Sequence, residues 1–280
     1  MERSEFPAVL PFELHTHTVA SGHGTKDTVA DLAKAACKKG MFALGISEHG
    51  PATPLSCSES YFRGLKTAPK KRAGIRVYYG AEANILDETG RLDLSGDTLC
   101  GLDFVIASIH PNSYFCPAYE PVPLYEKVVV YETGRLPKAH PVMKDAQEAV
   151  RCNTEAYIGA MQNPFVRVIG HPDDVRYPVD VKALVAAAVR YGVALEVNEA
   201  SLEPGGHRGD TRSTMRAILL ECQRFGHPVL LSSDSHGASL VGEAPLACAL
   251  LSEMGFPKEL VLNLMSPEAF WSLKRKAPER

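Results

Sequence analysis

The sequence predicts an α/β fold in which helices surround a parallel, TIM-like barrel of seven strands. Short apolar segments recur along the chain, and amphipathic helical stretches separate the later ones. At 280 residues the chain has the length of one barrel, so we expect a single domain over residues 1–280. Hydrophobic residues at 45% and charged residues at 22% exclude disordered, collagen-like and coiled-coil chains.

Seven segments are expected to form the barrel strands: residues 12–18, 42–47, 76–86, 104–110, 166–171, 194–199 and 229–233. Helices are expected at residues 25–39, where apolar side chains share one face, and at residues 180–191 and 210–225. This alternation places parallel strands inside and helices outside.

Two segments interrupt the alternation. Residues 87–96 begin with Asp-Glu-Thr-Gly, which predicts a turn and a short antiparallel excursion. Residues 111–144 hold six of the 20 prolines and four of the ten tyrosines, which predicts an insert after the fourth strand. The insert is either a lid or interface arm or a packing elaboration without functional contacts, and the sequence leaves both open.

Charge and cysteine content narrow the function classes. The chain has 30 Lys+Arg and 33 Asp+Glu, a net charge of -3, which argues against general nucleic-acid coating. Its longest apolar stretch, residues 183–189, is far shorter than the roughly 20 residues of a membrane-spanning helix. Seven cysteines form no C-x-x-C pair, so we expect reduced thiols in a cytoplasmic protein.

Potential metal ligands cluster near the ends of the predicted strands. His15 and His17 are two residues apart on one strand and therefore share a face, and Asp234 and His236 repeat this spacing. The other candidates are His23, His49, Glu82, His110 and His171. Because parallel barrel strands end at one rim, we expect all nine side chains to converge there.

Nine ligands are too many for one ion, because zinc takes three or four protein ligands. We therefore expect about three divalent ions that share a carboxylate, most simply zinc, with manganese or iron as alternatives. Such ions outweigh the two carboxylate charges and deprotonate bound water near neutral pH. The ligand set thus predicts hydrolysis of a phosphate ester.

A glycine-rich turn, Gly205-Gly206-His207-Arg208-Gly209, precedes the helix expected near Asp210. Glycine backbone, an arginine and a helix N-terminus together favour phosphate, so His207 and Arg208 are candidate catalytic residues beside Glu82 and Asp234. The alternative is an ordinary glycine-rich turn with a surface arginine.

Six motifs resemble those of the PHP (polymerase and histidinol phosphatase) family, in the family's order from about Phe12 to His236. They are Leu14-His15-Thr16-His17-Thr18, Ser47-Glu48-His49-Gly50-Pro51, Gly80-Ala81-Glu82-Ala83-Asn84, Ser108-Ile109-His110, Gly170-His171-Pro172 and Ser233-Asp234-Ser235-His236. The chain is most similar to stand-alone bacterial phosphatases with a trinuclear, usually zinc, centre in a distorted (β/α)7 barrel.

The resemblance implies a division of the ligands among three ions. His15, His17, Glu82 and Asp234 would bind the first, and Glu82 would bridge to a second. His110 and His171 would complete the second site, and His23, His49 and His236 would hold the third. Glu48 stands where many relatives have Asp, and it either supports a ligand or points into the barrel wall. His140 and His227 match no motif and are expected on the surface or in loops.

The principal hypothesis is a metal-dependent phosphatase in which a metal-bridging hydroxide attacks a small phosphomonoester. Histidinol phosphate is one specific substrate, and a nucleotide or sugar phosphate is another. The alternatives are a PHP-type exonuclease or phosphodiesterase, a metal-sensing or scaffold module, and an amidohydrolase. The absence of a basic track argues against nucleic acid, and Glu82 with the Asp-x-His ending argues against an amidohydrolase.

Overall fold

The computed structural model describes residues 6–111, 113–120 and 141–273. Its main sheet follows the order β1-β3-β5-β6-β7-β8-β9, and each neighbouring pair on this path is parallel. These strands are β1 (Phe12–Glu13), β3 (Ala43–Ile46), β5 (Ile75–Asn84), β6 (Phe104–Ser108), β7 (Val166–Ile169), β8 (Ala194–Asn198) and β9 (Val229–Ser232). The predicted α/β barrel of seven parallel strands is confirmed.

The barrel is nearly closed where its first and last strands approach each other. The segments β2 (Thr16–His17) and β10 (Ser235–His236) form a separate parallel pair. Between β1 and β9, the Asn263 amide donates to the carbonyls of Phe12 and Leu231, at 2.8 and 2.9 Å. An asparagine side chain therefore stands in for the missing strand-to-strand bonds between β1 and β9.

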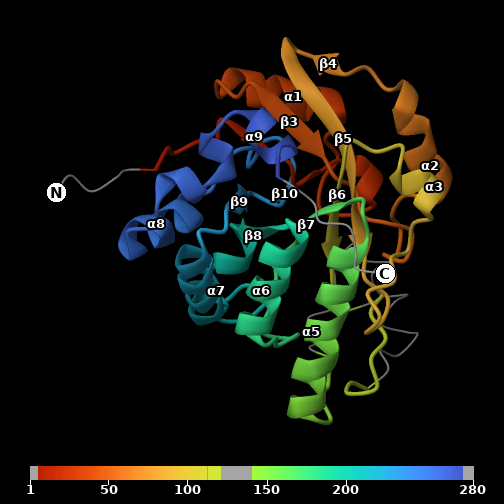
Figure 1. Cartoon of the computed structure of the whole chain (residues 1–280). Helices are drawn as coiled ribbons and strands as arrows, with labels where there is room; N and C mark the ends of the chain where they lie inside the picture. The colour runs from red at the N-terminus through yellow and green to blue at the C-terminus, as the bar shows by residue number, and fades with distance from the viewer. Residues whose placement is uncertain (1–5, 112, 121–140, 274–280) are drawn as a thin grey trace.

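Helices cover the outside of the sheet, with α5, α6 and α7 side by side along one part of it (Figure 1). The α-helices are α1 (Val29–Lys38), α2 (Glu59–Gly64), α3 (Gly96–Leu99), α5 (Ala146–Gln162), α6 (Val181–Tyr191), α7 (Arg212–Phe225), α8 (Pro245–Met254) and α9 (Pro267–Trp271). The 3-10 helices are η1 (Val19–Ser21), η2 (Leu65–Thr67), η3 (Ala200–Leu202), η4 (Lys258–Leu260) and η5 (Leu262–Leu264). Among the residues described, no helix has the length and apolar character needed to cross a membrane.

Local sequence signals explain several helix boundaries. Thr28 and Asp31 form a capping box at the start of α1, and Asp180 caps α6 by accepting bonds from two backbone amides. Helix α7 begins at Arg212, slightly later than predicted. The first predicted strand is split into β1 and β2, and α5 was not among the predicted helices.

The barrel interior is apolar at one end and polar at the other. Phe104, Ile106 and Leu230 belong to an apolar cluster that also includes Leu262 and Phe270 from the C-terminal part of the chain. A larger apolar cluster packs the helices against the outside of the sheet. The opposite end of the barrel, where the strands end, is therefore left for polar side chains.

The two interruptions predicted from the sequence are partly described. Ile85 and Leu92 form the expected antiparallel bridge after β5, and Tyr119 pairs with Met143 across the base of the insert. Residues 121–140, which include His140 and most of the predicted lid or arm, lie outside the described residues. The role of the insert stays a prediction.

Candidate metal centre

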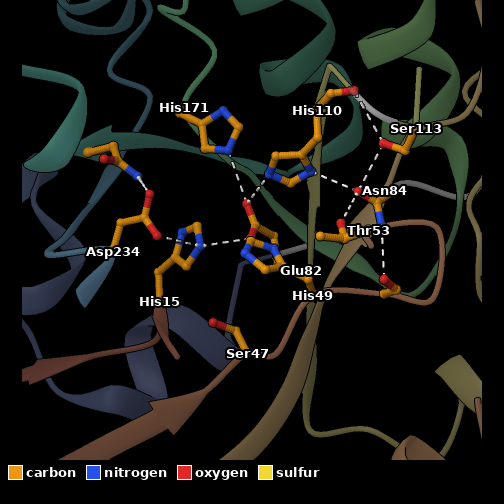
Figure 2. A network of polar contacts seen from close by, with 12 residues as sticks. His15, Ser47, His49, Thr53, Glu82, Asn84, His110, Ser113, His171 and Asp234 are labelled. Carbon is orange, nitrogen blue, oxygen red and sulfur yellow. Dashed lines mark hydrogen bonds and ion pairs between the residues drawn. The ribbon is translucent and has the colours of Figure 1, made fainter. Parts of the chain in front are cut away.

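All nine predicted ligands lie around one polar centre near the strand ends, with Glu82 of β5 in the middle. Figure 2 shows six of them, without His17, His23 and His236. One oxygen, Oε1, lies 3.0 Å from Nε2 of His171 and 3.3 Å from Nε2 of His110. The other, Oε2, lies 3.3 Å from Nε2 of His15 and 2.6 Å from Nδ1 of His49. A carboxylate whose two oxygens face different imidazoles has the arrangement of a bridging ligand.

One compact group contains His15, His17 and Asp234, whose ligand atoms all lie within 4.8 Å of one another. Oδ1 of Asp234 is 3.4 Å from Nε2 of His15 and 3.3 Å from Nε2 of His17. These three residues come from opposite ends of the sequence, and the β2–β10 pairing brings them together. They fit the first ion site that the resemblance implies.

His23, His49 and His236 lie on the other side of His17. Nε2 of His236 is 3.2 Å from Nε2 of His23, and the His23 and His49 rings are stacked with centroids 5.1 Å apart. His49 also groups with Glu82 and His110 within 4.8 Å. His49 therefore lies between the sites that the resemblance separates into a second and a third ion.

The position of His236 beside His23 requires a glycine at position 24. Gly24 has φ +80°, and a Cβ there would lie 2.7 Å from Cβ of His236. Any side chain at this position would displace the imidazole, so the Gly22-His23-Gly24 turn sets the position of two candidate ligands at once.

Several buried ligand atoms have no hydrogen-bond partner among the described residues. Those that face the centre are Nε2 of His15, Nε2 of His17, Nδ1 of His49 and Oε2 of Glu82. A buried polar atom left unpaired costs about 1–3 kcal/mol, and here four share one small volume. Divalent cations would satisfy them, so the residues fit the metal centre expected from the sequence.

Hydrogen bonds from the ring nitrogens that face away from the centre fix the tautomers of three candidate ligands. Nδ1 of His15 donates to Glu196 Oε1 at 2.6 Å, and Nδ1 of His110 donates to Asn84 Oδ1 at 2.8 Å. Nδ1 of His17 donates to the Ser21 hydroxyl at 3.0 Å. With the proton held on Nδ1, each ring turns an unprotonated Nε2 toward the centre, as a metal ligand requires.

Glu48 belongs to this supporting layer. Its carboxylate accepts a hydrogen bond from the Ser21 hydroxyl, which itself accepts from His17. Thr18 also donates to Glu48 through its hydroxyl, at 2.5 Å. Of the two roles that the sequence left open for Glu48, the structure supports the one in which it orients a ligand.

Burial and neighbouring charges keep the carboxylates ionised and most of the imidazoles neutral. Burial would raise the pKa of Glu82, but the imidazoles led by His15 hold it well below its usual range. Burial lowers the pKa of His110 to about 4 and, with His49 and His236 beside it, that of His23 to about 3. Cation binding needs these protonation states.

Three carboxylates surround the imidazole of His15. Burial would lower its pKa, but the carboxylates of Glu196, Glu82 and Asp234 raise it well above the usual value. Three carboxylates around one imidazole attract either a proton or a metal ion.

Two candidate ligands have strained backbone. His171 has φ 31° and Asp234 has φ 52°, although neither is glycine. Such conformations cost of the order of 1–3 kcal/mol each and persist where the surroundings enforce them. Each is the second residue after a barrel strand, β7 or β9, where the backbone turns its side chain into the centre.

Arg208 and His207 occupy different surroundings on the glycine-rich turn. Arg208 is buried, and its Nη2 donates to Oδ2 of Asp234 at 2.9 Å. Its Nη1 donates to Asn198 and Ser201, at 3.2 Å each. His207 is exposed. The arginine thus contacts a candidate ligand directly.

The sequence analysis missed Glu196, Asn198 and Asn84, which hold the ligands in place. Glu196 accepts from His15 and from the backbone amide of His171, and Asn198 donates to both Glu196 and Asp234. A signal was available, because Glu196 and Asn198 alternate with apolar residues on a strand expected to be buried on both faces.

His227 was expected on the surface or in a loop. It does follow α7 in a loop, but its side chain is buried, and its Nε2 donates to the Val193 carbonyl at 2.9 Å. The surface expectation was wrong, because the loop after α7 lies against Val193, just before β8.

A family model for the PHP domain matches residues 13–200, more than half of the chain. The chain belongs to the PHP domain family. This match agrees with the resemblance drawn from the motifs, and it covers five of the ligand-bearing segments described above, those of His15, His49, Glu82, His110 and His171.

Relatives of this PHP chain have similar length. A protein of Caldicellulosiruptor bescii named "Probable phosphatase" is 35% identical over 263 residues, covering 94% of this chain and 95% of the relative. A "Probable phosphatase" of Caldanaerobacter subterraneus subsp. tengcongensis is also 35% identical, covering 91% of this chain and 87% of the relative.

Solved structures support the PHP fold. The histidinol phosphate phosphatase of Lactococcus lactis, solved with zinc, L-histidinol and phosphate, superposes with a TM-score of 0.55 at 18% identity. The comparison covers 88% of this chain and 94% of that one. A putative histidinol phosphatase of Listeria monocytogenes gives a TM-score of 0.54 at 17% identity, covering 82% and 97%.

Proposed function

We propose that this chain is a metal-dependent phosphatase that hydrolyses a small phosphomonoester. The observation that carries the proposal is the buried cluster of imidazoles and carboxylates around Glu82, with its four unpaired ligand atoms. The names of the PHP relatives support the same reaction class. In this proposal the nine predicted ligands hold three divalent ions, preferably zinc.

Bound divalent ions supply a water that deprotonates near neutral pH and positive charge opposite the phosphate oxygens. The chain's own residues position this chemistry. Glu82 joins two ligand groups through its two oxygens, and Asp234 joins the His15–His17 pair to Arg208. Glu196 and Asn84 hold the imidazoles of His15 and His110 in the ligating tautomer.

Arg208 acts in this proposal as a positioning residue for Asp234, since its two terminal nitrogens are already engaged. Its Nε is buried, has no hydrogen-bond partner among the described residues and lies 4.0 Å from Oδ2 of Asp174. His207, exposed on the same turn, stays a candidate catalytic residue in this proposal.

The test is hydrolysis of a panel of phosphomonoesters, including histidinol, sugar and nucleotide phosphates, with zinc or manganese added. Glu82→Gln should lower kcat/KM by more than about 100-fold and reduce bound metal, because a shared ligand loses its charge. Glu259→Gln, on an exposed carboxylate of η4, is the matched control and should behave as wild type. No turnover of any monoester would refute the proposal.

A labelled single strand of DNA, assayed beside the monoesters, tests the nuclease alternative. With a net charge of -3 the chain has no excess of basic residues for binding nucleic acid. We therefore expect no degradation of the DNA strand. Cleavage of the strand with monoesters untouched would favour the nuclease.

A further inference from the structure

A second cluster of metal-ligating side chains lies outside the candidate metal centre. Glu88, Cys116 and Cys152 each place one ligand atom within 4.8 Å of the other two. Both cysteines are buried and free, and Glu88 is partly exposed. No cysteine belongs to the centre around Glu82, so this cluster has a different chemistry.

We propose that Glu88, Cys116 and Cys152 form a separate zinc site with two thiolate ligands. Thiolates are soft ligands that select zinc, and a carboxylate oxygen completes many zinc sites. Zinc–sulfur bonds of about 2.3 Å and zinc–oxygen bonds of about 2.0 Å make tetrahedral ligand separations of about 3.5–3.8 Å. Side-chain atoms within 4.8 Å of one another reach that separation by small rotations.

A further oxygen stands at the expected separation. The Cys152 thiol donates to Oε1 of Glu148 over 3.6 Å, close to the sulfur–oxygen edge of a tetrahedral zinc site. Glu148 lies one helical turn before Cys152 in α5, so helix geometry holds the two side chains on one face. Glu148 or a water molecule supplies the fourth ligand.

Neighbouring groups would stabilise both thiolates. Nη2 of Arg151 lies 3.4 Å from Sγ of Cys152 and brings a positive charge to it. The Tyr114 hydroxyl is buried beside the Cys116 thiol. A Cys116 thiolate would accept a hydrogen bond from this hydroxyl.

The burial of Cys152 disfavours redox chemistry at this thiol. Burial and the neighbouring Cys116 thiol raise the pKa of Cys152 to about 12. A buried thiol with a raised pKa is a poor nucleophile and therefore a poor redox sensor. Two adjacent thiolates become stable only with a cation between them, because zinc deprotonates the thiols that bind it.

The proposed site would join three segments of the chain. Glu88 lies in the turn after β5, Cys116 in the segment after β6, and Cys152 in α5. The segments already touch, because the Phe115 amide donates to the Leu86 carbonyl at 2.8 Å. The turn after β5 also packs closely on α5: a Cβ added to Gly90 would lie only 2.1 Å from the Ala160 nitrogen. A zinc ion here would fix the segment that begins at His110.

Cobalt(II) is the probe that tests the site. Bound to thiolates it gives a near-ultraviolet charge-transfer absorption, which the cysteine-free centre around Glu82 cannot produce. We expect this absorption in the reduced, chelator-treated wild-type protein after cobalt is added. The Cys116→Ser/Cys152→Ser double variant should lose it and should bind one zinc ion fewer per chain.

Two further variants keep the test sharp. Cys222→Ser, which changes a buried thiol of α7, is the matched control and should retain the absorption. Glu88→Gln, at a partly exposed turn position, should retain the absorption but bind cobalt at least about tenfold more weakly. This variant remains informative if the double variant does not fold.

The results that would overturn the proposal are no thiolate absorption in the wild type or its persistence in the double variant. Unchanged cobalt affinity in Glu88→Gln, or a disulfide between Cys116 and Cys152 in protein purified without added oxidant, would also overturn it. Failure of the phosphatase proposal would leave this absorption unchanged, so the two proposals fail separately.

Discussion

Arg208 and Asp234 form a buried ion pair in which Nη2 of the arginine donates to Oδ2 of the carboxylate at 2.9 Å. The other carboxylate oxygen, Oδ1, faces Nε2 of His15 and Nε2 of His17. One side of Asp234 is therefore held by the arginine while the other faces the candidate ligands. The geometry makes the arginine a determinant of where Asp234 points.

Arg208→Lys should lower zinc affinity and kcat/KM by about 10–100-fold, because lysine keeps the charge but loses the planar fork. Metal content in a chelator-buffered series and steady-state kinetics measure the two effects. Arg216→Lys, in an exposed pair with Glu253, is the control and should change neither quantity. A rise in KM with unchanged zinc affinity would instead assign Arg208 to direct substrate binding.

Asn84 connects His110 to the surrounding loops. Its Oδ1 accepts from His110 and from the Thr53 hydroxyl, and its Nδ2 donates to Asp93 at 2.6 Å. Asn84→Leu should lower zinc affinity about 10–100-fold and destabilise the fold by about 1–3 kcal/mol, since several polar groups lose their partner.

Thr53→Val is the matched control for Asn84, because it removes one donor to the same amide and leaves the acceptor of His110 intact. It should cost about 1 kcal/mol of stability with little change in zinc affinity. Equal losses of zinc affinity in the two variants would contradict a specific role of Asn84 in orienting His110.

The strands and the positions of the candidate ligands could be predicted because both depend on short-range pattern. A run of apolar residues predicts a strand, and a parallel barrel then brings the ends of its strands to one rim. His15, Glu82 and Asp234 are far apart in sequence, and this rule predicts that they meet at the same rim.

The remaining features depend on contacts that no local pattern encodes. Asn263 closes the barrel across more than two hundred residues of chain, and Arg208 turns toward Asp234, 26 residues away. The glycine-rich turn predicted a helix N-terminus open to phosphate, but this long-range pair engages its arginine. Cys116 and Cys152 lack a metal-binding spacing, and only the packing of α5 makes them neighbours.

Removal of metal should destabilise the protein. Without cations the buried ligand atoms of the centre stay unpaired, and the carboxylates around His15 repel one another. Each tenfold excess of zinc over its dissociation constant should add about 1.4 kcal/mol to the free energy of unfolding. Calorimetry of chelator-treated protein during zinc titration measures the rise in Tm.

The Glu82→Gln variant separates this stabilisation from zinc binding elsewhere on the chain. It should show a much smaller rise in Tm than the wild type, because the shared ligand is weakened. A rise of equal size in both proteins would mean that zinc stabilises the fold through other residues.

His227 should make stability depend on pH below neutrality. Burial lowers its pKa below the ordinary value of 6.5, although the bond to the Val193 carbonyl opposes this shift. Below pH 6.5 the unfolded chain therefore takes up a proton that the folded protein still excludes. The free energy of unfolding therefore decreases as the pH is lowered. His227→Gln keeps a donor for Val193 but does not titrate. Denaturant unfolding of both metal-loaded proteins between about pH 7 and about pH 5 should show the steeper loss in the wild type, and parallel curves would contradict the assignment.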